Sequence, residues 1–378
     1  MLDFLLSVTN HEQTIERTAA QAGFARVGFS RVKRLNDREA FYAQWLGQGR
    51  HGAMEYLARK PERRFDPRAI DGRFKSVVSL LWPYAPPSPP AVDWRTELRG
   101  RIAAYALGPD YHDYVLKGAR VVSGAIESLC PGAVTRTYVD TGPVFEREWA
   151  ARARLGWFGK NTMLLTRERG SYFFVAEVFT DVEFDGADAP YREHCGTCRQ
   201  CLDLCPTQAL EDGYVMEPRK CISYLTIENR GPIPRELRAK VGMWLFGCDI
   251  CQEVCPWNPD APEHGDDDLM PRLLELMALD DFSFSRRFSK SAIKRAKRGG
   301  LLRNAAVVLG NTGNRDAVPA LTQVLEREPE ALVRSHAAWA LGELGGRSAR
   351  HALERARERD IDAQVVEEAR AGLDRTVT

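Results

Sequence analysis

The stretch that decides the fold of this chain opens with Cys195-Gly-Thr-Cys198-Arg-Gln-Cys201-Leu-Asp-Leu-Cys205-Pro206 and closes with Cys248-Asp-Ile-Cys251-Gln-Glu-Val-Cys255-Pro256. Together with Cys221, which lies between the two runs, it holds eight of the 9 cysteines in the 378-residue chain. A run of the form CxxCxxCxxxCP is typical of bacterial domains whose thiolates hold cubane iron–sulfur clusters. The sequence therefore predicts a two-cluster, ferredoxin-like domain.

The spacing also predicts which thiolates share a cluster. Three thiolates two residues apart can surround one cluster, whereas the fourth, which precedes a proline, ligates the other cluster. We therefore expect crossed sets. The first [4Fe–4S] cluster would be held by Cys195, Cys198, Cys201 and Cys255, and the second by Cys205, Cys221, Cys248 and Cys251. Cys130 stands alone after an apolar helical run and is interpreted as a small buried residue.

Two other readings of the cysteines stay open at this stage. Zinc also binds paired CxxC units, although the CxxCxxCxxxCP order is unusual for it, and a disulfide framework requires an oxidising compartment. The first residues, MLDFLLSVTNHEQ, have no basic segment, and no apolar run approaches the length of a bilayer span. We expect a soluble cytoplasmic protein with reduced thiols and no membrane partner.

Residues 1–185 are predicted to form an α/β domain. Its expected elements follow from apolar periodicity and from Gly and Pro at their ends. They are helices over Glu12–Ala22 and Tyr111–Leu129, a helix started by Pro143, and strands at Arg26–Phe29, Ser76–Trp82, Val134–Val139 and Ser171–Phe179. The domain has neither a GxGxxG fingerprint nor a GxxxxGK[ST] loop, so a Rossmann dinucleotide site or a P-loop is not indicated.

Three islands within this domain contain candidate site residues. They are His51–Leu57 with the nearby Pro61–Pro67, Tyr138–Pro143 and Gly156–Asn161. Catalytic groups often lie where a rigid strand ends in a loop. Structural readings compete with this one: Asp140 could cap the following helix, Lys160 and Asn161 could be turn residues, Arg64 could pair on the surface, and His51 could be a capping or core histidine.

The cluster domain, residues 186–262, carries an insertion at 222–247, in which a short helix is expected over Arg235–Leu245. Lys plus Arg (53) nearly balance Asp plus Glu (52), so any partner preference must lie in local patches. One such patch begins in a linker and basic segment, 263–289, and continues beyond it. Between Phe282 and Asn304 there is no acid, and the cations are Arg286, Arg287, Lys290, Lys294, Arg295, Lys297, Arg298 and Arg303. A run of this kind is often only a solvated face, but it predicts a phosphate-binding, RNA-contacting surface.

The final segment, residues 290–378, contains a repeat with a period of 32 residues. Ala305–Gly310 aligns with Ala337–Gly342, and Ala317 and Leu321 align with Ala349 and Leu353. Two helices per repeat with small residues at their contacts predict α-helical HEAT-like repeats. So short a solenoid needs a neighbour, so we expect it to dock on the cluster domain.

In combination these features resemble the epoxyqueuosine reductases. The resemblance covers nearly the whole chain and is carried, besides the cysteines, by the motifs HGAMEYL, PERRFDPR, DYHDYVLK, YVDTGP, GWFGKN, RNAAVVLG and HAAWALG. It implies an oxidoreductase that reduces epoxyqueuosine to queuosine at the wobble position of tRNA, the last step of queuosine biosynthesis. The reaction would proceed through cob(I)alamin, with electrons from an external one-electron donor relayed by two [4Fe–4S] clusters.

The resemblance also implies roles for individual residues. Asp140 would be the proton donor, with a pKa raised by burial beside the corrin. Cobalamin contacts are expected from Arg64, Tyr105, Lys160, Asn161 and Ser223. We further expect a monomer. Two alternatives remain: a corrinoid and iron–sulfur reductase of a small molecule, similar to reductive dehalogenases, and a ferredoxin-type module that only transfers electrons.

Overall fold

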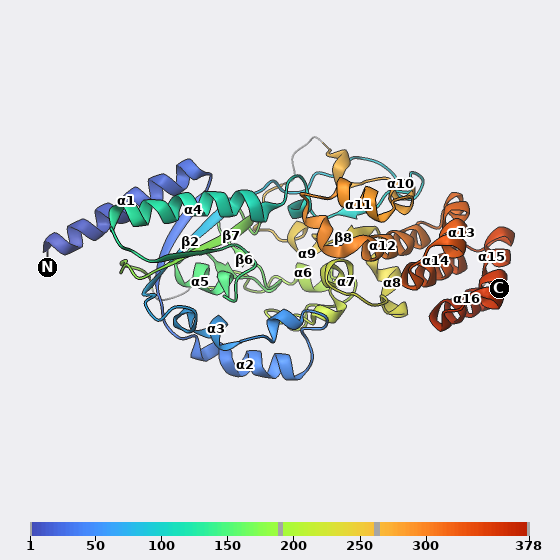
Figure 1. Cartoon of the computed structure of the whole chain (residues 1–378), viewed down its shortest axis with the longest axis horizontal. Coiled ribbons are helices and arrows are strands. Elements are labelled where there is room, and N and C mark those ends of the chain that lie inside the picture. The colour runs from blue at the N-terminus through green and yellow to red at the C-terminus, as the bar shows by residue number, and fades with distance from the viewer. Residues whose placement is uncertain (1, 188–191, 261–264, 376–378) are drawn as a thin grey trace.

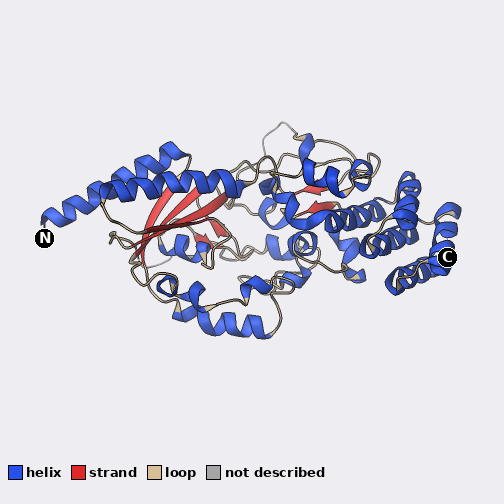
Figure 2. Cartoon of the chain, in the orientation of Figure 1, coloured by secondary structure: helices blue, strands red, loops and turns tan. Residues whose placement is uncertain are grey.

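The computed structural model describes residues 2–187, 192–260 and 265–375. The molecule is elongated, with the N-terminal helix and sheet at one end and the C-terminal helices at the other (Figure 1). Strands gather in the N-terminal half and near the middle, whereas the C-terminal end is helical (Figure 2). Among the helices of the described residues, none combines the length and the apolar character needed to cross a membrane.

A four-stranded antiparallel sheet forms the N-terminal domain. Its strand order is β1 (Arg26–Arg31), β2 (Ser76–Pro83), β7 (Phe173–Thr180) and β4 (Thr135–Tyr138). Two long helices, α1 (Leu2–Ala22) and α4 (Tyr111–Leu129), pack together beside one face, and α5 (Glu146–Arg152) packs against the other. The apolar positions of α4 explain this arrangement, because Val115, Ala119, Val122 and Ile126 are all fully buried in one core with Val78 and Val178.

Shorter elements complete this domain and lead from it to the cysteines. They are α2 (Asn36–Gly47), η1 (Glu55–Leu57), α3 (Glu62–Phe65), η2 (Pro67–Ala69), β5 (Trp157–Phe158) and β6 (Leu164–Leu165). The helix over Tyr111–Leu129 has the predicted bounds, α1 begins earlier than predicted, and α2 was missed because none of its residues is buried.

The middle of the chain is built from short elements around the cysteines. They are β3 (Arg101–Ile102), η3 (Ala104–Ala106), α6 (Gln200–Asp203), η4 (Pro218–Lys220), α7 (Ile222–Ile227), α8 (Arg235–Val241), β8 (Trp244–Phe246) and α9 (Ile250–Glu253). The predicted helix over Arg235–Leu245 is wrong at its end. Gly242 has φ 60°, which stops the helix, and the next residues form β8, which pairs in parallel with β3.

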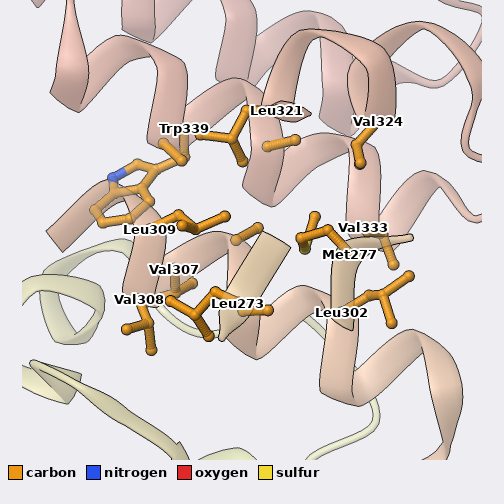
Figure 3. Close-up of a cluster of buried hydrophobic side chains, with 14 of the residues drawn as sticks. Leu273, Met277, Leu302, Val307, Val308, Leu309, Leu321, Val324, Val333 and Trp339 are labelled. Carbon is orange, nitrogen blue, oxygen red and sulfur yellow. The ribbon is translucent and has the colours of Figure 1, made fainter. Parts of the chain in front are cut away.

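The C-terminal part stacks helices in pairs. Its elements are η5 (Asp267–Leu269), α10 (Leu273–Met277), α11 (Asp281–Arg287), η6 (Ala292–Ala296), α12 (Lys297–Thr312), η7 (Arg315–Ala317), α13 (Val318–Arg327), α14 (Ala331–Leu344), α15 (Arg347–Arg359) and α16 (Ala363–Arg375). Figure 3 shows Leu309, Leu321 and Trp339, from three successive long helices, in one apolar cluster that Leu273 and Met277 of α10 join.

This helical core continues into the insertion of the cluster domain. Ile233, Leu237 and Phe246 belong to the same buried cluster as Leu309. Polar groups fix the contact: Asn304 Nδ2 donates to the carbonyl oxygens of Thr226 (2.8 Å) and Leu245 (2.9 Å). A buried ion pair at 2.8 Å also joins Arg238 of α8 to Glu368 of α16. The repeats therefore dock on the insertion, as predicted.

Candidate active site

The cysteines gather into two groups in the middle of the molecule. All 9 lie within the described residues as free thiols, so the disulfide reading is wrong. Cys195, Cys198, Cys201 and Cys255 line one cavity, which Lys160 and Trp257 also border. The second predicted set is also close together, because the charges of Cys221 and Cys205 add to desolvation in raising the pKa of the Cys251 thiol, and those of Cys251 and Cys221 do the same to the pKa of Cys248. Among the described residues, no three His, Cys, Asp or Glu side chains converge as ligands of a single metal ion.

Backbone amides point toward two of these sulfur atoms. The thiol of Cys221 receives the N–H groups of Ser223 and Tyr224 in the first turn of α7, although desolvation still raises its pKa. Ala209 donates its N–H to Cys205 Sγ at 3.4 Å. Hydrogen bonds to the sulfur ligands are one of the means by which a protein sets the potential of an iron–sulfur cluster. The site thus supplies both thiolates and the groups that tune them.

Lys160 and Asn161 tie the N-terminal domain to the cysteine loops. Lys160 Nζ donates to the carbonyl oxygens of Gly196 (2.6 Å) and Cys198 (2.9 Å). Asn161 is 3% exposed, and its Nδ2 donates to the carbonyl oxygen of Cys251 at 3.0 Å. Both residues lie in a turn, as the structural interpretation expected, because the Thr162 N–H donates to the Gly159 carbonyl oxygen at 2.9 Å, and from that turn they also hold the cysteine loops. Their predicted contact with cobalamin stays a prediction. Their polar atoms form hydrogen bonds with the cysteine loops.

Asp140 lies where β4 ends, in a left-handed backbone conformation with φ 57°. Its Oδ2 accepts a hydrogen bond from Tyr111 Oη at 2.7 Å, and His112 Nε2 lies 3.4 Å from the same oxygen. Its backbone N–H donates to the carboxylate of Glu146. The capping interpretation is wrong, because α5 starts at Glu146 with no side-chain cap. The side chain is 63% exposed and therefore accessible to a bound molecule.

The pKa of Asp140 is lowered, whereas we predicted that it would be raised. Desolvation raises it, but the hydrogen bonds from His112 and Tyr111, together with the charge of Arg147, outweigh desolvation and leave the pKa below its ordinary value. The neighbouring Glu146 behaves in the opposite way. Desolvation and the negative charge of Asp140 raise the pKa of Glu146 to about 8. At neutral pH Glu146 is therefore mostly protonated, whereas Asp140 carries its negative charge.

Tyr105 connects Asp140 with the second cysteine group. Its ring centroid is 6.1 Å from that of Tyr111 and 6.3 Å from that of Phe246, which precedes Cys248 by two residues. Beside it, the Ala104 N–H donates to the carboxylate of Asp249 at 2.7 Å. This chain of contacts spans the space between the acid and the cysteines that the sequence placed in separate domains.

The first island of sequence contacts the insertion. Ala53 donates its N–H to Tyr224 Oη at 2.8 Å, and a Cβ on Gly52 would lie 2.2 Å from the same oxygen. Tyr224 is the residue after Ser223 in α7, so the helix that carries Ser223 contacts the N-terminal domain. Arg64 is 7% exposed, not a surface residue, and its Nη2 donates to the Tyr56 carbonyl oxygen at 3.3 Å. Arg64 Nε and His51 Nδ1 are buried without a hydrogen-bond partner among the described residues.

The sequence did not identify Tyr111, His112, Glu146 or Tyr224 as site residues. Tyr111 and His112 stand in the quoted DYHDYVLK motif, and Asp110, just before them, caps α4 by accepting the His112 N–H. A polar cluster at a helix start was the available signal. The spacing of residues along the sequence did not predict that the start of α4 would lie next to Asp140.

The eight cations of the basic run fall into two groups, those that are exposed and those that are paired or buried. Arg286, Arg287, Lys290, Lys294 and Lys297 are exposed and have no carboxylate partner among the described residues. The other three are engaged: Arg295 pairs with Glu228 (2.8 Å), Arg298 pairs with Glu328 (2.6 Å), and Arg303 is 0% exposed.

The phosphate prediction is wrong for Arg303 and is weakened for its two paired neighbours. Arg303 donates to the backbone carbonyl oxygens of Asn229, Gly231 and Leu225, so it holds the insertion against α12. Next to the exposed cations, Phe282 is 71% exposed and the guanidinium of Arg286 lies 5.6 Å from its ring centroid.

Comparisons with known proteins agree with these parts. Residues 194–258 match a 4Fe-4S double cluster binding domain, residues 64–141 match the epoxyqueuosine reductase QueG family model, and residues 290–374 match HEAT repeats. The iron–sulfur prediction and the repeat prediction are therefore confirmed.

Two relatives are named epoxyqueuosine reductase. That of Leadbetterella byssophila is 40% identical over 304 residues, which are 79% of this chain and 98% of that protein. That of Pseudomonas aeruginosa is 40% identical over 334 residues, 86% of this chain and 92% of that protein.

Solved structures match along almost the whole chain. An epoxyqueuosine reductase crystallised with an epoxyqueuosine-modified tRNA stem loop superposes with a TM-score of 0.90 at 30% identity, covering 98% of this chain and 100% of that one. The Bacillus subtilis enzyme, solved with its catalytic aspartate loop swung out of the active site, gives a TM-score of 0.88 at 29% identity and covers 97% and 99%. This chain therefore belongs to the epoxyqueuosine reductase family.

Proposed function

We propose that this protein reduces epoxyqueuosine in tRNA to queuosine, using cobalamin and two [4Fe–4S] clusters. The observation that carries the proposal is the connection of Asp140 through Tyr111 and Tyr105 to the second group of cysteines. An acid and an electron relay then meet at one site. A related enzyme of the same fold, which covers 98% of this chain, was crystallised with an epoxyqueuosine-modified tRNA stem loop, which supports the substrate.

The residues around Asp140 fit a large polar cofactor. Arg64 Nε and His51 Nδ1 are buried without a hydrogen-bond partner among the described residues, Tyr105 contacts both Tyr111 and Phe246, and the backbone N–H of Ser223 points to Cys221. Of the predicted contacts, Arg64, Tyr105 and Ser223 would hold cobalamin, and His51 is added to them here. When bound, cobalamin supplies the electron-rich metal centre that no side chain can replace in opening a carbon–oxygen bond.

The protein's own residues then have defined tasks. The thiolates of Cys195, Cys198, Cys201 and Cys255, and those of Cys205, Cys221, Cys248 and Cys251, would hold the two clusters that pass on electrons from an external one-electron donor. Asp140 would give a proton to the oxygen that leaves carbon, which is general acid catalysis and typically contributes about 10²–10⁴-fold to a rate.

The exposed cations would contact the phosphates of the RNA. The pKa of Arg295 is raised by its hydrogen bond with Glu228 and, in smaller part, by the negative charge of Asp140, so the basic run extends to the neighbourhood of the acid. Tyr56 is 42% exposed under the Arg295 guanidinium, at 5.4 Å from ring centroid to Cζ. An aromatic ring and a guanidinium plane are the groups on which proteins stack bases taken from single-stranded RNA loops.

The test of the proposal is anaerobic reconstitution of the full chain with iron, sulfide and cobalamin. Cobalt and iron analysis with an absorption spectrum reports the cofactors, and mass spectrometry of nucleosides from epoxyqueuosine-containing tRNA reports the product. We expect both cofactors and conversion to queuosine. Iron without cobalt would favour an electron-transfer module, and cobalt without RNA turnover would favour a small-molecule reductase.

Two further properties belong to the same proposal. Because the proposed substrate is tRNA, we also propose that the protein acts in the cytoplasm. We also infer a monomer, because α16 covers the last repeat through Ala369 and Leu373, which are buried in the shared core. Light scattering of the reconstituted protein should give the mass of one chain, 42.5 kDa.

A further inference from the structure

A chain of three polar side chains leads from Asp140 to the start of α4. His112 Nε2 lies 3.4 Å from Asp140 Oδ2, and His112 Nδ1 lies 2.6 Å from Asp110 Oδ1. The two ring nitrogens therefore face two different carboxylates. His112 and Asp110 are about one-third exposed, with side chains 32% and 29% accessible, so protons can reach them from solvent.

The surroundings hold this imidazole in one orientation. Its ring stacks on Tyr111 with centroids 4.0 Å apart, and Tyr111 in turn stacks on Phe174 at 4.2 Å and an interplanar angle of 4°. The Asp110 carboxylate accepts a hydrogen bond from the His112 backbone N–H at 3.1 Å. The same oxygen lies 2.6 Å from Nδ1 of the His112 ring. An imidazole between two carboxylates can donate from both nitrogens only when it is protonated.

The reaction consumes more protons than a single carboxyl group such as Asp140 can hold. Converting an epoxide to an alkene and water consumes two electrons and two protons. Asp140 accepts a hydrogen bond from Tyr111 and faces His112, and such partners favour a carboxylate in its charged form. The resting acid therefore has no proton of its own and must receive one from a neighbour.

We propose that His112 is a positioning residue that supplies the proton which Asp140 passes to the substrate oxygen, with Asp110 fixing the imidazole. The N–H bond at Nε2 breaks as an O–H bond forms on Asp140, and that O–H bond breaks as the substrate oxygen is protonated. Solvent restores the imidazolium, and the external donor provides the electrons. This inference rests on the proposed function, because it takes Asp140 as the donor to substrate.

Several charged and titratable groups face this relay. Those on neighbouring elements, besides Asp110 and Asp140, are Tyr56 on η1, Tyr105 on η3, Tyr111 on α4, Glu146 and Arg147 on α5, and Arg295 on η6. Desolvation lowers the pKa of His112, but its hydrogen bonds with Asp140 and Asp110 outweigh that effect and raise it above 6.5. Turnover should therefore be high below the pKa of His112 and fall as the pH rises through it, because the imidazolium is lost.

The test compares H112Q with H351Q, a substitution of an exposed histidine on α15, in reconstituted full-length enzyme. We expect H112Q to keep its iron and cobalt and its KM for RNA, while single-turnover rates fall about 10²-fold. The alkaline fall in the rate profile should disappear. Imidazole buffer should restore part of the rate of H112A, and H351Q should match the wild type.

A second readout does not depend on turnover. In ¹⁵N-histidine-labelled protein with oxidised clusters, NMR titration should give His112 a pKa that drops in D140N and in D110N and is unchanged in H351Q. Full rates and an unaltered pH profile in H112Q would overturn the relay. An active D140N would instead overturn the donor assignment in the proposed function, so the two failures can be told apart.

Discussion

Reversing two charges in the exposed part of the basic run should weaken RNA binding by a calculable amount. Arg286 and Arg287 lie at the end of α11, exposed and without a carboxylate partner among the described residues. Each phosphate contact contributes about 0.7–0.9 to the slope of log K against log salt concentration. Five contacts, one for each exposed cation, therefore predict a slope of about −3.5 to −4.5.

The double variant R286E/R287E should lose two of these contacts. Its slope should become less steep by about 1.4–1.8, so that raising salt from about 50 to 200 mM weakens binding about 25-fold instead of about 250-fold. The assay is fluorescence anisotropy of a labelled anticodon stem loop over that salt range. The same variant should raise the apparent KM for tRNA in turnover.

A matched control is R357E/R359E. These two arginines are exposed at the end of α15, at the far C-terminal end of the molecule, and their reversal should leave the slope unchanged (Figure 1). An unchanged slope in R286E/R287E would refute the reasoning, because RNA could then not lie across α11. Equal losses in both variants would mean that the net charge of the protein, not this surface, governs binding.

Four further predictions address the site and the core. D140A should keep iron and cobalt but slow turnover about 10²–10⁴-fold in single-turnover assays, and full activity would remove Asp140 from the mechanism. C248S should lose about half of the iron on colorimetric analysis, whereas C130S should keep all of it, since only one of these thiols is a predicted ligand. The pKa of Glu146 is raised to about 8 in the folded protein, so the folded state holds a proton that the unfolded state has lost, and folding becomes less stable as pH rises from about 4.5 to about 8. The melting temperature of E146Q should therefore fall less than that of the wild type over this range. Parallel curves for the two proteins would contradict the raised pKa. L309A should lower the free energy of unfolding by about 2–5 kcal/mol, because Leu309 is fully buried in the shared core, and a loss below about 1 kcal/mol in denaturant titration would contradict that packing.

The sequence was most informative where the signal is local. The CxxC spacing places thiolates around a cluster within a few residues, and the helical period of Tyr111–Leu129 needs no distant partner. The 32-residue repeat likewise predicted the paired C-terminal helices because each unit packs on its neighbour.

Errors arose where distant segments decide the outcome. The lowered pKa of Asp140 comes from Tyr111 and His112, some thirty residues earlier, which the motif around Asp140 does not contain. Arg303 follows other cations in the sequence and was therefore predicted to lie on the surface. In the structure its side chain projects from α12 and donates to carbonyl oxygens of the insertion. The strand that replaces the predicted end of the helix, β8, pairs with β3, which lies more than 130 residues before it.

The shared core between the insertion and the repeats has a consequence for how the protein fails. Asn304 and Arg238 join α12 and α8 to segments on either side, so the C-terminal helices and the cysteine loops should open as one cooperative unit. A nick or premature stop in the last helices would then expose the metal centres to oxygen. Its first sign would be loss of the visible absorption of the predicted clusters, and RNA binding should weaken with it, because α11 with Arg286 and Arg287 packs into the same core through Phe284.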